Sequence, residues 1–144
     1  MKADLLAGAL ALTVAAPALA DGHLMTYPYE GSFENAAFAV ETAIVNQGLV
    51  IDYVSHVGDM LNRTREDVGG EKIFDEADVY LFCSAVVSRS VMEADPMNLV
   101  YCPYSIFVAN QDGEITVGHP TYPEGEMQEV QALLEGIVKE ALEE

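Results

Sequence analysis

The sequence predicts an α+β fold, in which a mostly antiparallel sheet is backed by helices on one face. Three features predict it: an amphipathic helix pattern that begins at Ser32, a second one that closes the chain after Met127, and a sharp turn at Asp112-Gly113. Asp-Gly between two apolar runs is a strong β-hairpin signal. Helices on either side of a strand-rich middle segment favour a sheet with its helices segregated to one face.

The N-terminal segment has the pattern of an export signal. Lys2 is followed by an apolar run over residues 5–16 and by small residues that end at Ala20. This order fits a secretory signal peptide, and the run is too short to span a membrane as a helix. We therefore expect residues 1–20 to be a signal peptide and residues 21–144 to be a single domain. The location is then periplasmic or secreted, with no membrane association after cleavage.

The chain is strongly acidic. It has 24 Asp and Glu against 6 Lys and Arg, which gives a formal net charge of −18. Such a polyanion repels nucleic acid and anionic lipid, so a nucleic-acid partner is excluded. We interpret the charge as an acidic surface that keeps an exported protein soluble. The alternative is attraction of a cationic partner or a metal. A small-molecule ligand and self-association are both compatible with the sequence.

The first half of the domain begins with a short aromatic strand over residues 23–31. Pro28 lacks a backbone N–H and confines this strand to an edge or places the proline at a strand end. Ser32 is then expected to cap a helix that Gly48 ends. Residues 49–57 form a strand with apolar side chains on both faces, which predicts a central position in the sheet.

A charged segment separates this strand from the next. Residues 59–62 are expected to form a short helical turn, and residues 63–71 a charged loop closed by Gly69-Gly70.

The second half predicts strands over residues 78–83 and 104–109, with a helix over residues 85–95 between them that Pro96 ends. The return segment, residues 97–102, is expected to be extended. We expect the core to combine helix stripes with inward-facing strand residues, namely Val40, Ile44, Val130, Leu134, Ile137, Ile51, Leu81, Ile106 and Val108.

Cys83 and Cys102 are the two cysteines of the chain. A helix after Cys83 runs out about 16 Å, and an extended return covers about 20 Å, so the two cysteines meet if their strands are antiparallel. An oxidising compartment then favours a structural disulfide. Thiolate ligation of Cu(I) or a haem iron, with Met92, Met97 or His119 as further ligands, is an alternative. A thiol-dependent redox enzyme is a weaker one.

The order of elements resembles the bacterial family called domain of unknown function 302. The resemblance is carried by Asn46-Gln47-Gly48-Leu49-Val50, the strand into Phe82, the Met92-Glu93-Ala94-Asp95-Pro96 break, and Cys102-Pro103-Tyr104-Ser105-Ile106-Phe107-Val108 leading to Asp112-Gly113. It implies a compact α+β domain in a TATA-box-binding-protein-like arrangement, and no established reaction. Many relatives lack the cysteine pair, so its role is argued from chemistry alone.

The sequence contains no nucleotide-binding loop, hydrolase elbow or closed zinc pattern, so a binding or accessory module is favoured over an enzyme. The alternative is a purely structural or interaction protein, in which the disulfide only stabilises the fold. The ligand of a binding module is expected at the cysteine end of the sheet, where Arg89, Met92 and Tyr104 are the candidate contacts. Arg89 offers an anion clamp there. The alternative is an ordinary surface pair between Arg89 and Glu93, four residues later in the helix.

Cleavage after Ala20 would create a second candidate site. The new terminus reads Asp21-Gly22-His23. The terminal amine, two amide nitrogens and the imidazole then suit square-planar Cu(II) or Ni(II). Copper is the metal that this pattern favours.

Overall fold

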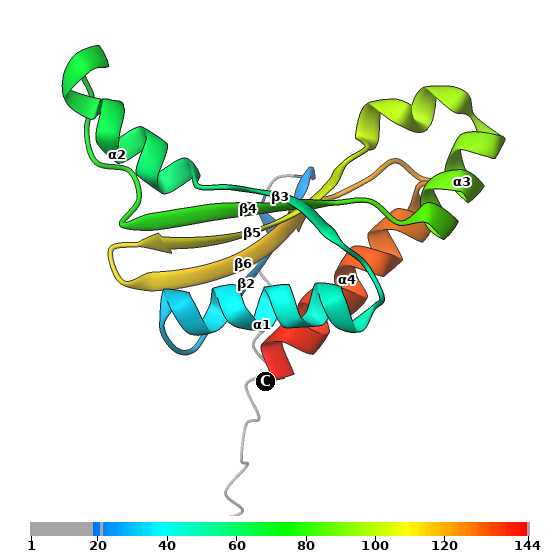
Figure 1. Cartoon of the computed structure of the whole chain (residues 1–144), viewed down its shortest axis with the longest axis horizontal. Coiled ribbons are helices and arrows are strands. Elements are labelled where there is room, and N and C mark those ends of the chain that lie inside the picture. The colour runs from blue at the N-terminus through cyan, green and yellow to red at the C-terminus, as the bar shows by residue number, and fades with distance from the viewer. Residues whose placement is uncertain (1–18, 21, 144) are drawn as a thin grey trace, which may run out of the picture.

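The computed structural model describes residues 19–20 and 22–143. The strands form one antiparallel sheet in the order β1-β2-β6-β5-β4-β3 (Figure 1). The strands are β1 (Leu19–Ala20), β2 (Leu24–Tyr29), β3 (Ile51–Ser55), β4 (Glu76–Phe82), β5 (Tyr104–Gln111) and β6 (Glu114–Pro120). The helices are α1 (Phe33–Asn46), α2 (Val57–Val68), α3 (Ala85–Ala94), the 3-10 helix η1 (Pro96–Tyr101) and α4 (Gln128–Glu143).

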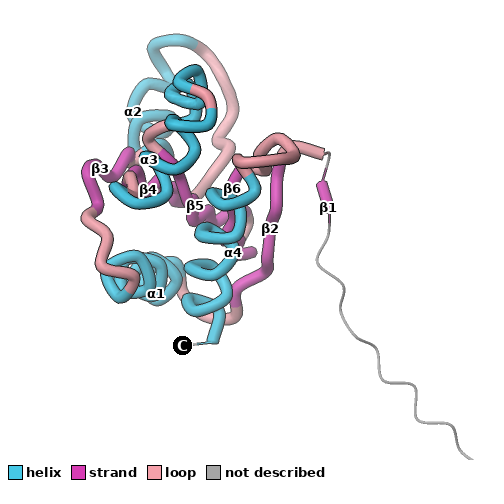
Figure 2. The backbone as a smooth tube through the Cα atoms, turned by 90° about the vertical axis from the view of Figure 1, so that its right-hand side faces the viewer, coloured by secondary structure: helices cyan, strands magenta, loops and turns pink. Residues whose placement is uncertain are grey.

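Helices α1 and α4 pack against each other and against the same face of the sheet. Figure 2 shows the sheet close to edge-on, with α1 and α4 on one side and α2 on the other. The expected α+β class, with a mostly antiparallel sheet backed by helices, is therefore confirmed. None of the described helices is long and apolar enough to cross a membrane.

The local signals of the helices are confirmed. The Ser32 hydroxyl accepts a hydrogen bond from the backbone N–H of Asn35 at 3.2 Å and caps α1. Gly48, after the end of α1, has a φ of +74°, which favours glycine. The Asp112-Gly113 turn has positive φ at both residues, as a two-residue hairpin of the primed type requires.

The helix-side core is largely as expected. Val40, Ile44, Val130, Leu134, Ile137, Ile106 and Val108 are buried. The assignment of Leu81 to this core is wrong, because β4 pairs Tyr80 with Ile106 and Leu81 with Ser105. Since neighbouring strand residues point to opposite faces, Tyr80 and Phe82 occupy the core instead. Ile51 is partly buried and packs at the margin of the core.

The strand expected to be central is an edge strand. Among the described strands, β3 pairs only with β4, and Tyr53 is exposed. The central positions belong to β5 and β6, because their hairpin places them side by side. By contrast, Pro28 lies in the part of β2 that β1 does not reach, so its predicted edge position is confirmed.

Two segments have a different local structure from the one expected. The charged residues 57–68 form helix α2, because no glycine or proline that could end it occurs between Gly58 and Gly69. Residues 97–102 are not extended, since Pro96–Tyr101 is the 3-10 helix η1. The Asp95 side chain caps η1 by accepting a hydrogen bond from the backbone N–H of Met97 at 2.9 Å.

Candidate functional site

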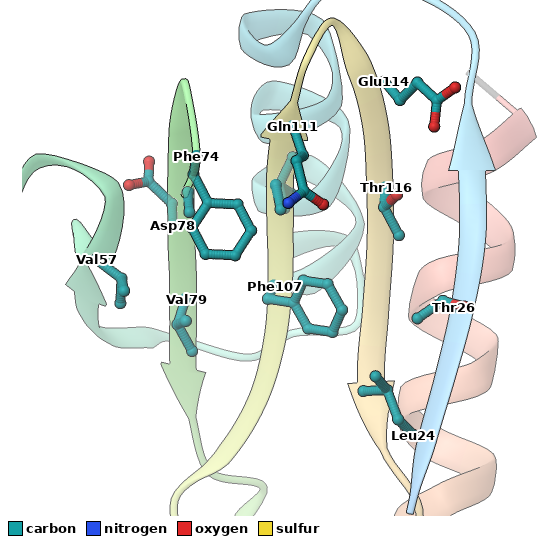
Figure 3. Close-up of a pocket in the computed structure, with 13 residues that line it drawn as sticks. Leu24, Thr26, Val57, Phe74, Asp78, Val79, Phe107, Gln111, Glu114 and Thr116 are labelled. Atoms are coloured by element: carbon teal, nitrogen blue, oxygen red, sulfur yellow. The ribbon is translucent and has the colours of Figure 1, made fainter. Parts of the chain in front are cut away.

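The sheet face opposite α1 and α4 holds a cavity of about 380 Å³, which we call the open-face cavity (Figure 3). Its floor is formed by β4, β5, β6 and β2, and its wall by the start of α2 and the segment that precedes β4. Most of its lining is apolar. The lining residues are Leu24, Thr26, Val57, Phe74, Ala77, Asp78, Val79, Phe107, Val108, Ala109, Gln111, Glu114 and Thr116.

Phe107 forms the centre of the floor. It lies opposite Gly118 in the β5–β6 register and next to Val79 of β4. A Cβ atom on Gly118 would lie 2.5 Å from the Phe107 ring, so the ring covers the space that glycine leaves. The glycine therefore lets the ring lie flat against the sheet, with its other face toward the cavity (Figure 3).

Helix α2 is held against the sheet by a close backbone contact. A Cβ on Gly58 would lie 2.5 Å from the backbone nitrogen of Ala77 and 3.0 Å from the carbonyl carbon of Glu76. Only glycine fits this approach. The contact places Val57, the first residue of α2, at the wall of the cavity.

Gly58→Ala is expected to lower the free energy of unfolding by about 1–3 kcal/mol, because the added methyl group collides with backbone rather than with a movable side chain. Urea denaturation measures the change. The matched control is Gly136→Ala in α4, where a Cβ would meet nothing within 4 Å. That change should stabilise the protein by about 0.5–1 kcal/mol through helix propensity. If both variants change the free energy of unfolding in the same direction, the close contact at Gly58 is contradicted.

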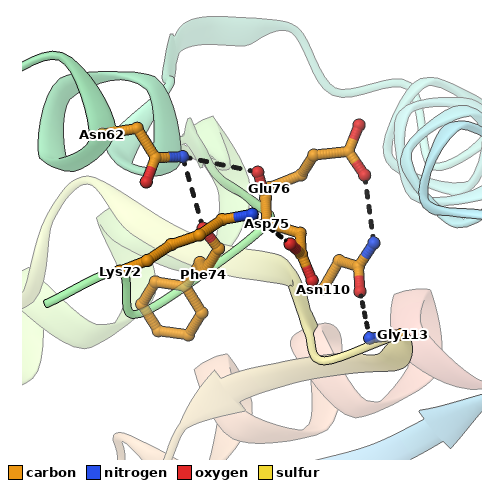
Figure 4. A network of polar contacts seen from close by, with 7 residues as sticks. All are labelled: Asn62, Lys72, Phe74, Asp75, Glu76, Asn110 and Gly113. Carbon is orange, nitrogen blue, oxygen red and sulfur yellow. Dashed lines mark hydrogen bonds and ion pairs between the residues drawn. The ribbon is translucent and has the colours of Figure 1, made fainter.

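A polar network fixes the segment that carries Phe74 (Figure 4). The Asn62 amide of α2 donates hydrogen bonds to the carbonyl oxygens of Phe74, at 3.3 Å, and Asp75, at 3.5 Å. Lys72 pairs with Asp75, and this bond lowers the pKa of the Asp75 carboxyl. The Phe74 ring is thereby held at the wall of the cavity.

The hairpin end of the cavity is ordered in the same way. The Asn110 amide donates to Glu76 at 3.1 Å, and its oxygen accepts from the Gly113 N–H at 3.1 Å (Figure 4). These bonds join β4 to the β5–β6 turn, next to the lining residues Gln111 and Glu114.

The charges on the lining are negative. Glu114 is its acidic side chain on the open side, whereas Asp78 lines it from β4 with its carboxylate on the same face as Tyr80. Its described residues include no Lys, Arg or His. The Asp78 carboxylate accepts a hydrogen bond from His56 Nδ1 at 2.7 Å, and this bond raises the pKa of His56. Glu114 has no ion pair within the described part of the chain.

The sequence did not predict this cavity. The available signal was the apolar character of both faces of β4, with Val79 and Leu81 on one side and Tyr80 and Phe82 on the other. A strand whose second face is apolar needs cover on both sides or a ligand.

The two cysteines meet as the antiparallel strands predict. Cys83 follows β4 and Cys102 precedes β5, and both half-buried thiols are free in this structure. Burial, together with a hydrogen bond between the two thiols, raises the pKa of Cys83 to about 12. They line an open hollow of about 380 Å³ with Asp52, Ser84 and Ser88. Few Cys83 thiolates exist at neutral pH, which disfavours a resident nucleophile.

The other residues expected at this end are divided between a neighbouring hollow and the core. Arg89 and Met92 line a shallow hollow of about 440 Å³ on α3. The Arg89 side chain is 77% exposed and lies 3.4 Å from Glu93, which is the surface pair that the spacing left as an alternative. Tyr104 is buried below them, with its hydroxyl 3.0 Å from the Ser88 hydroxyl.

The predicted copper terminus lies at the limit of the described structure. Gly22 and His23 are exposed, and Asp21 lies outside the described residues, as do residues 1–18 of the predicted signal peptide. Copper binding there stays a prediction. The described residues contain no group of three or more His, Cys, Asp or Glu side chains that could hold a metal ion.

His119 is a buried titratable group on the helix side of the sheet, as are Tyr80 and Tyr104. It is fully buried, and its Nδ1 donates to the carbonyl oxygen of Pro120 at 2.8 Å. Its Nε2 has no hydrogen-bond partner within the described residues. Burial lowers the pKa of His119, so the ring is neutral near pH 7.

The fold and the site define a class of protein: a small α+β domain with one antiparallel sheet, helices α1 and α4 on one face, and a cavity walled by α2 on the other. The sequence model of the family described as "Domain of unknown function DUF302" matches residues 25–144, and the chain belongs to this family. The resemblance seen in the sequence is thus confirmed.

The crystal structure of an uncharacterized conserved DUF302 protein from Bacillus stearothermophilus is similar to this chain. Its TM-score is 0.62 at 14% identity, and the match covers 83% of this chain and 95% of that one. At this identity the likeness establishes the fold. A search of curated proteins gave no match.

Proposed function

We propose that this protein is an exported, non-enzymatic binding module that holds a small molecule with an apolar body in the open-face cavity. The observation that carries the proposal is the cavity itself, about 380 Å³ with a mainly apolar lining. Small-molecule sites typically measure about 300–1,000 Å³ and combine apolar walls with a few polar groups. Thr26, Gln111 and Thr116 are such polar groups.

The rigidity of the walls supports a preformed site. Gly58 fixes the start of α2 on the sheet, and the Asn62 and Asn110 bonds fix the hairpin end of the cavity. A site that is ordered before the ligand arrives loses less conformational entropy on binding.

A neutral apolar probe tests the proposal. N-phenyl-1-naphthylamine is expected to bind the whole domain at one saturable site, seen as a rise in its fluorescence. Val79→Lys puts a charged chain on the floor of the cavity and is expected to weaken binding at least about tenfold, a loss of about 1.4 kcal/mol. Circular dichroism checks that the variant is folded.

Val86→Lys is the matched control for this experiment. Val86 lies on α3, is 77% exposed and does not line the open-face cavity, so this change should leave probe binding intact. Equal probe binding by Val79→Lys and the native chain would refute binding at this cavity.

We further propose that Cys83 and Cys102 form a disulfide in the exported protein and join the α3–η1 segment to the sheet. The contact between the thiols at the ends of neighbouring antiparallel strands supports this pairing. The export signal supports an oxidising compartment. The high pKa of Cys83 argues for a structural role over a redox enzyme.

A further inference from the structure

Resting on the proposed function, we infer that the ligand of the open-face cavity is an organic cation with an apolar body. The cavity carries the Glu114 carboxylate at its rim, aromatic rings on its floor and wall, and no described basic residue on its lining. Each of these features favours a positive charge on a ligand whose remainder is hydrocarbon.

The rim supplies the negative charge. Glu114 lies at the hairpin end of the cavity (Figure 3) and has no described cationic partner. The carboxylate of Asp78, in contrast, is already hydrogen bonded to His56 at 2.7 Å. A ligand cation is therefore expected at the Glu114 end, with its apolar body over Phe107 and Val79.

The rings supply a second attraction. Phe74 and Phe107 both line the cavity and present their rings to its open side (Figure 3). A cation over the face of an aromatic ring is attracted by the electrons of the ring. The Gln111 side chain adds an amide oxygen that can accept hydrogen bonds from an ammonium group.

The net charge of the whole chain also favours a cationic ligand. A formal net charge of −18 attracts cations to the surface and repels anions such as fatty acids. It also opposes a second copy of this chain on the open face, because each copy carries the same charge. An organic cation is therefore the occupant that both the local and the overall charge favour.

Three amphiphiles with the same tail separate charge from apolar binding. Octyltrimethylammonium, octyl glucoside and octyl sulfate are each used to displace N-phenyl-1-naphthylamine from the full domain. The cation is expected to act at roughly tenfold lower concentration than the anion in about 0.01 M salt. This ratio should shrink in about 1 M salt, where charges are screened within about 3 Å.

Glu114→Gln tests the rim. It is expected to weaken octyltrimethylammonium binding roughly two- to fivefold, as for other exposed ion pairs, and to leave octyl glucoside binding unchanged. Glu143→Gln is the matched control, since it removes the same charge from α4, on the opposite side of the sheet. If both variants weaken octyltrimethylammonium binding equally, the attraction comes from the net charge of the protein, and the specific role of Glu114 is refuted.

The outcomes distinguish this inference from the proposed function. If all three amphiphiles displace the probe equally and Val79→Lys still weakens probe binding, the preference for a cationic ligand is refuted, whereas the binding site is retained. No displacement by any of them, with no effect of Val79→Lys, would overturn both. A dimer in light scattering that Val79→Lys dissociates would assign the face to a second copy instead.

Discussion

Leu134→Ala is expected to lower the free energy of unfolding by about 2–5 kcal/mol. Leu134 is 0% exposed and lies in the middle of α4, within the buried cluster between the two helices and the sheet. Truncation removes apolar contacts and leaves a cavity that close-packed neighbours fill only in part. Urea denaturation followed by circular dichroism measures the difference, provided that the slope of the transition is unchanged.

Leu99→Ala is the matched control for this experiment. Leu99 lies in η1 and is 61% exposed, so its truncation should change stability by no more than about 0.5 kcal/mol. Equal losses from the two variants would mean that α4 does not close the core, and that the apolar stripe of α4 packs elsewhere.

The elements that could be predicted from the sequence are those whose signals are local. Ser32 caps α1 through a contact three residues away, and Ser84 caps α3 in the same way, by accepting from the Val87 N–H at 3.2 Å. The Asp112-Gly113 turn depends on the φ values of two neighbouring residues. Such signals hold whatever the rest of the chain does.

Two of the errors, the position of β3 and the orientation of Leu81, concern features that depend on distant partners. The apolar residues of β3 indicated a central strand, but strand order is decided by which strands pair, and β4 has β5 on its other side. Similarly, Leu81 and Phe82 are both apolar, and only the register with β5 determines that Phe82 faces the helices. A shift of one residue would exchange the two faces.

The same reasoning explains the candidate sites. The cysteine contact could be predicted, because it follows from two antiparallel strands joined by a short excursion. The open-face cavity could not, because its lining comes from four strands, a helix and a loop whose positions depend on tertiary packing. Gly118 illustrates the limit: in the sequence it weakens a strand, whereas in the structure it makes room for the Phe107 ring.

The proposed disulfide is expected to stabilise the protein by about 3 kcal/mol over the Cys83→Ser/Cys102→Ser double variant, because the bond limits the conformations of the unfolded chain. Urea denaturation with and without a thiol reductant measures this difference. Thiol titration of the denatured protein should find no free thiol before reduction. The reductant should lower the stability of the native chain only, since the double variant has no bond to lose.

Two reactive thiols in protein collected without reductant would contradict the disulfide. The pair would then be available for Cu(I), whose preference for soft sulfur ligands allows it to displace the thiol protons despite the raised pKa of Cys83. Anaerobic titration with Cu(I) against a chelator follows in that case. Cys83→Ser should abolish Cu(I) binding by the cysteine pair. His23→Ala, which removes the imidazole of the predicted N-terminal Cu(II) site, should leave this Cu(I) binding intact.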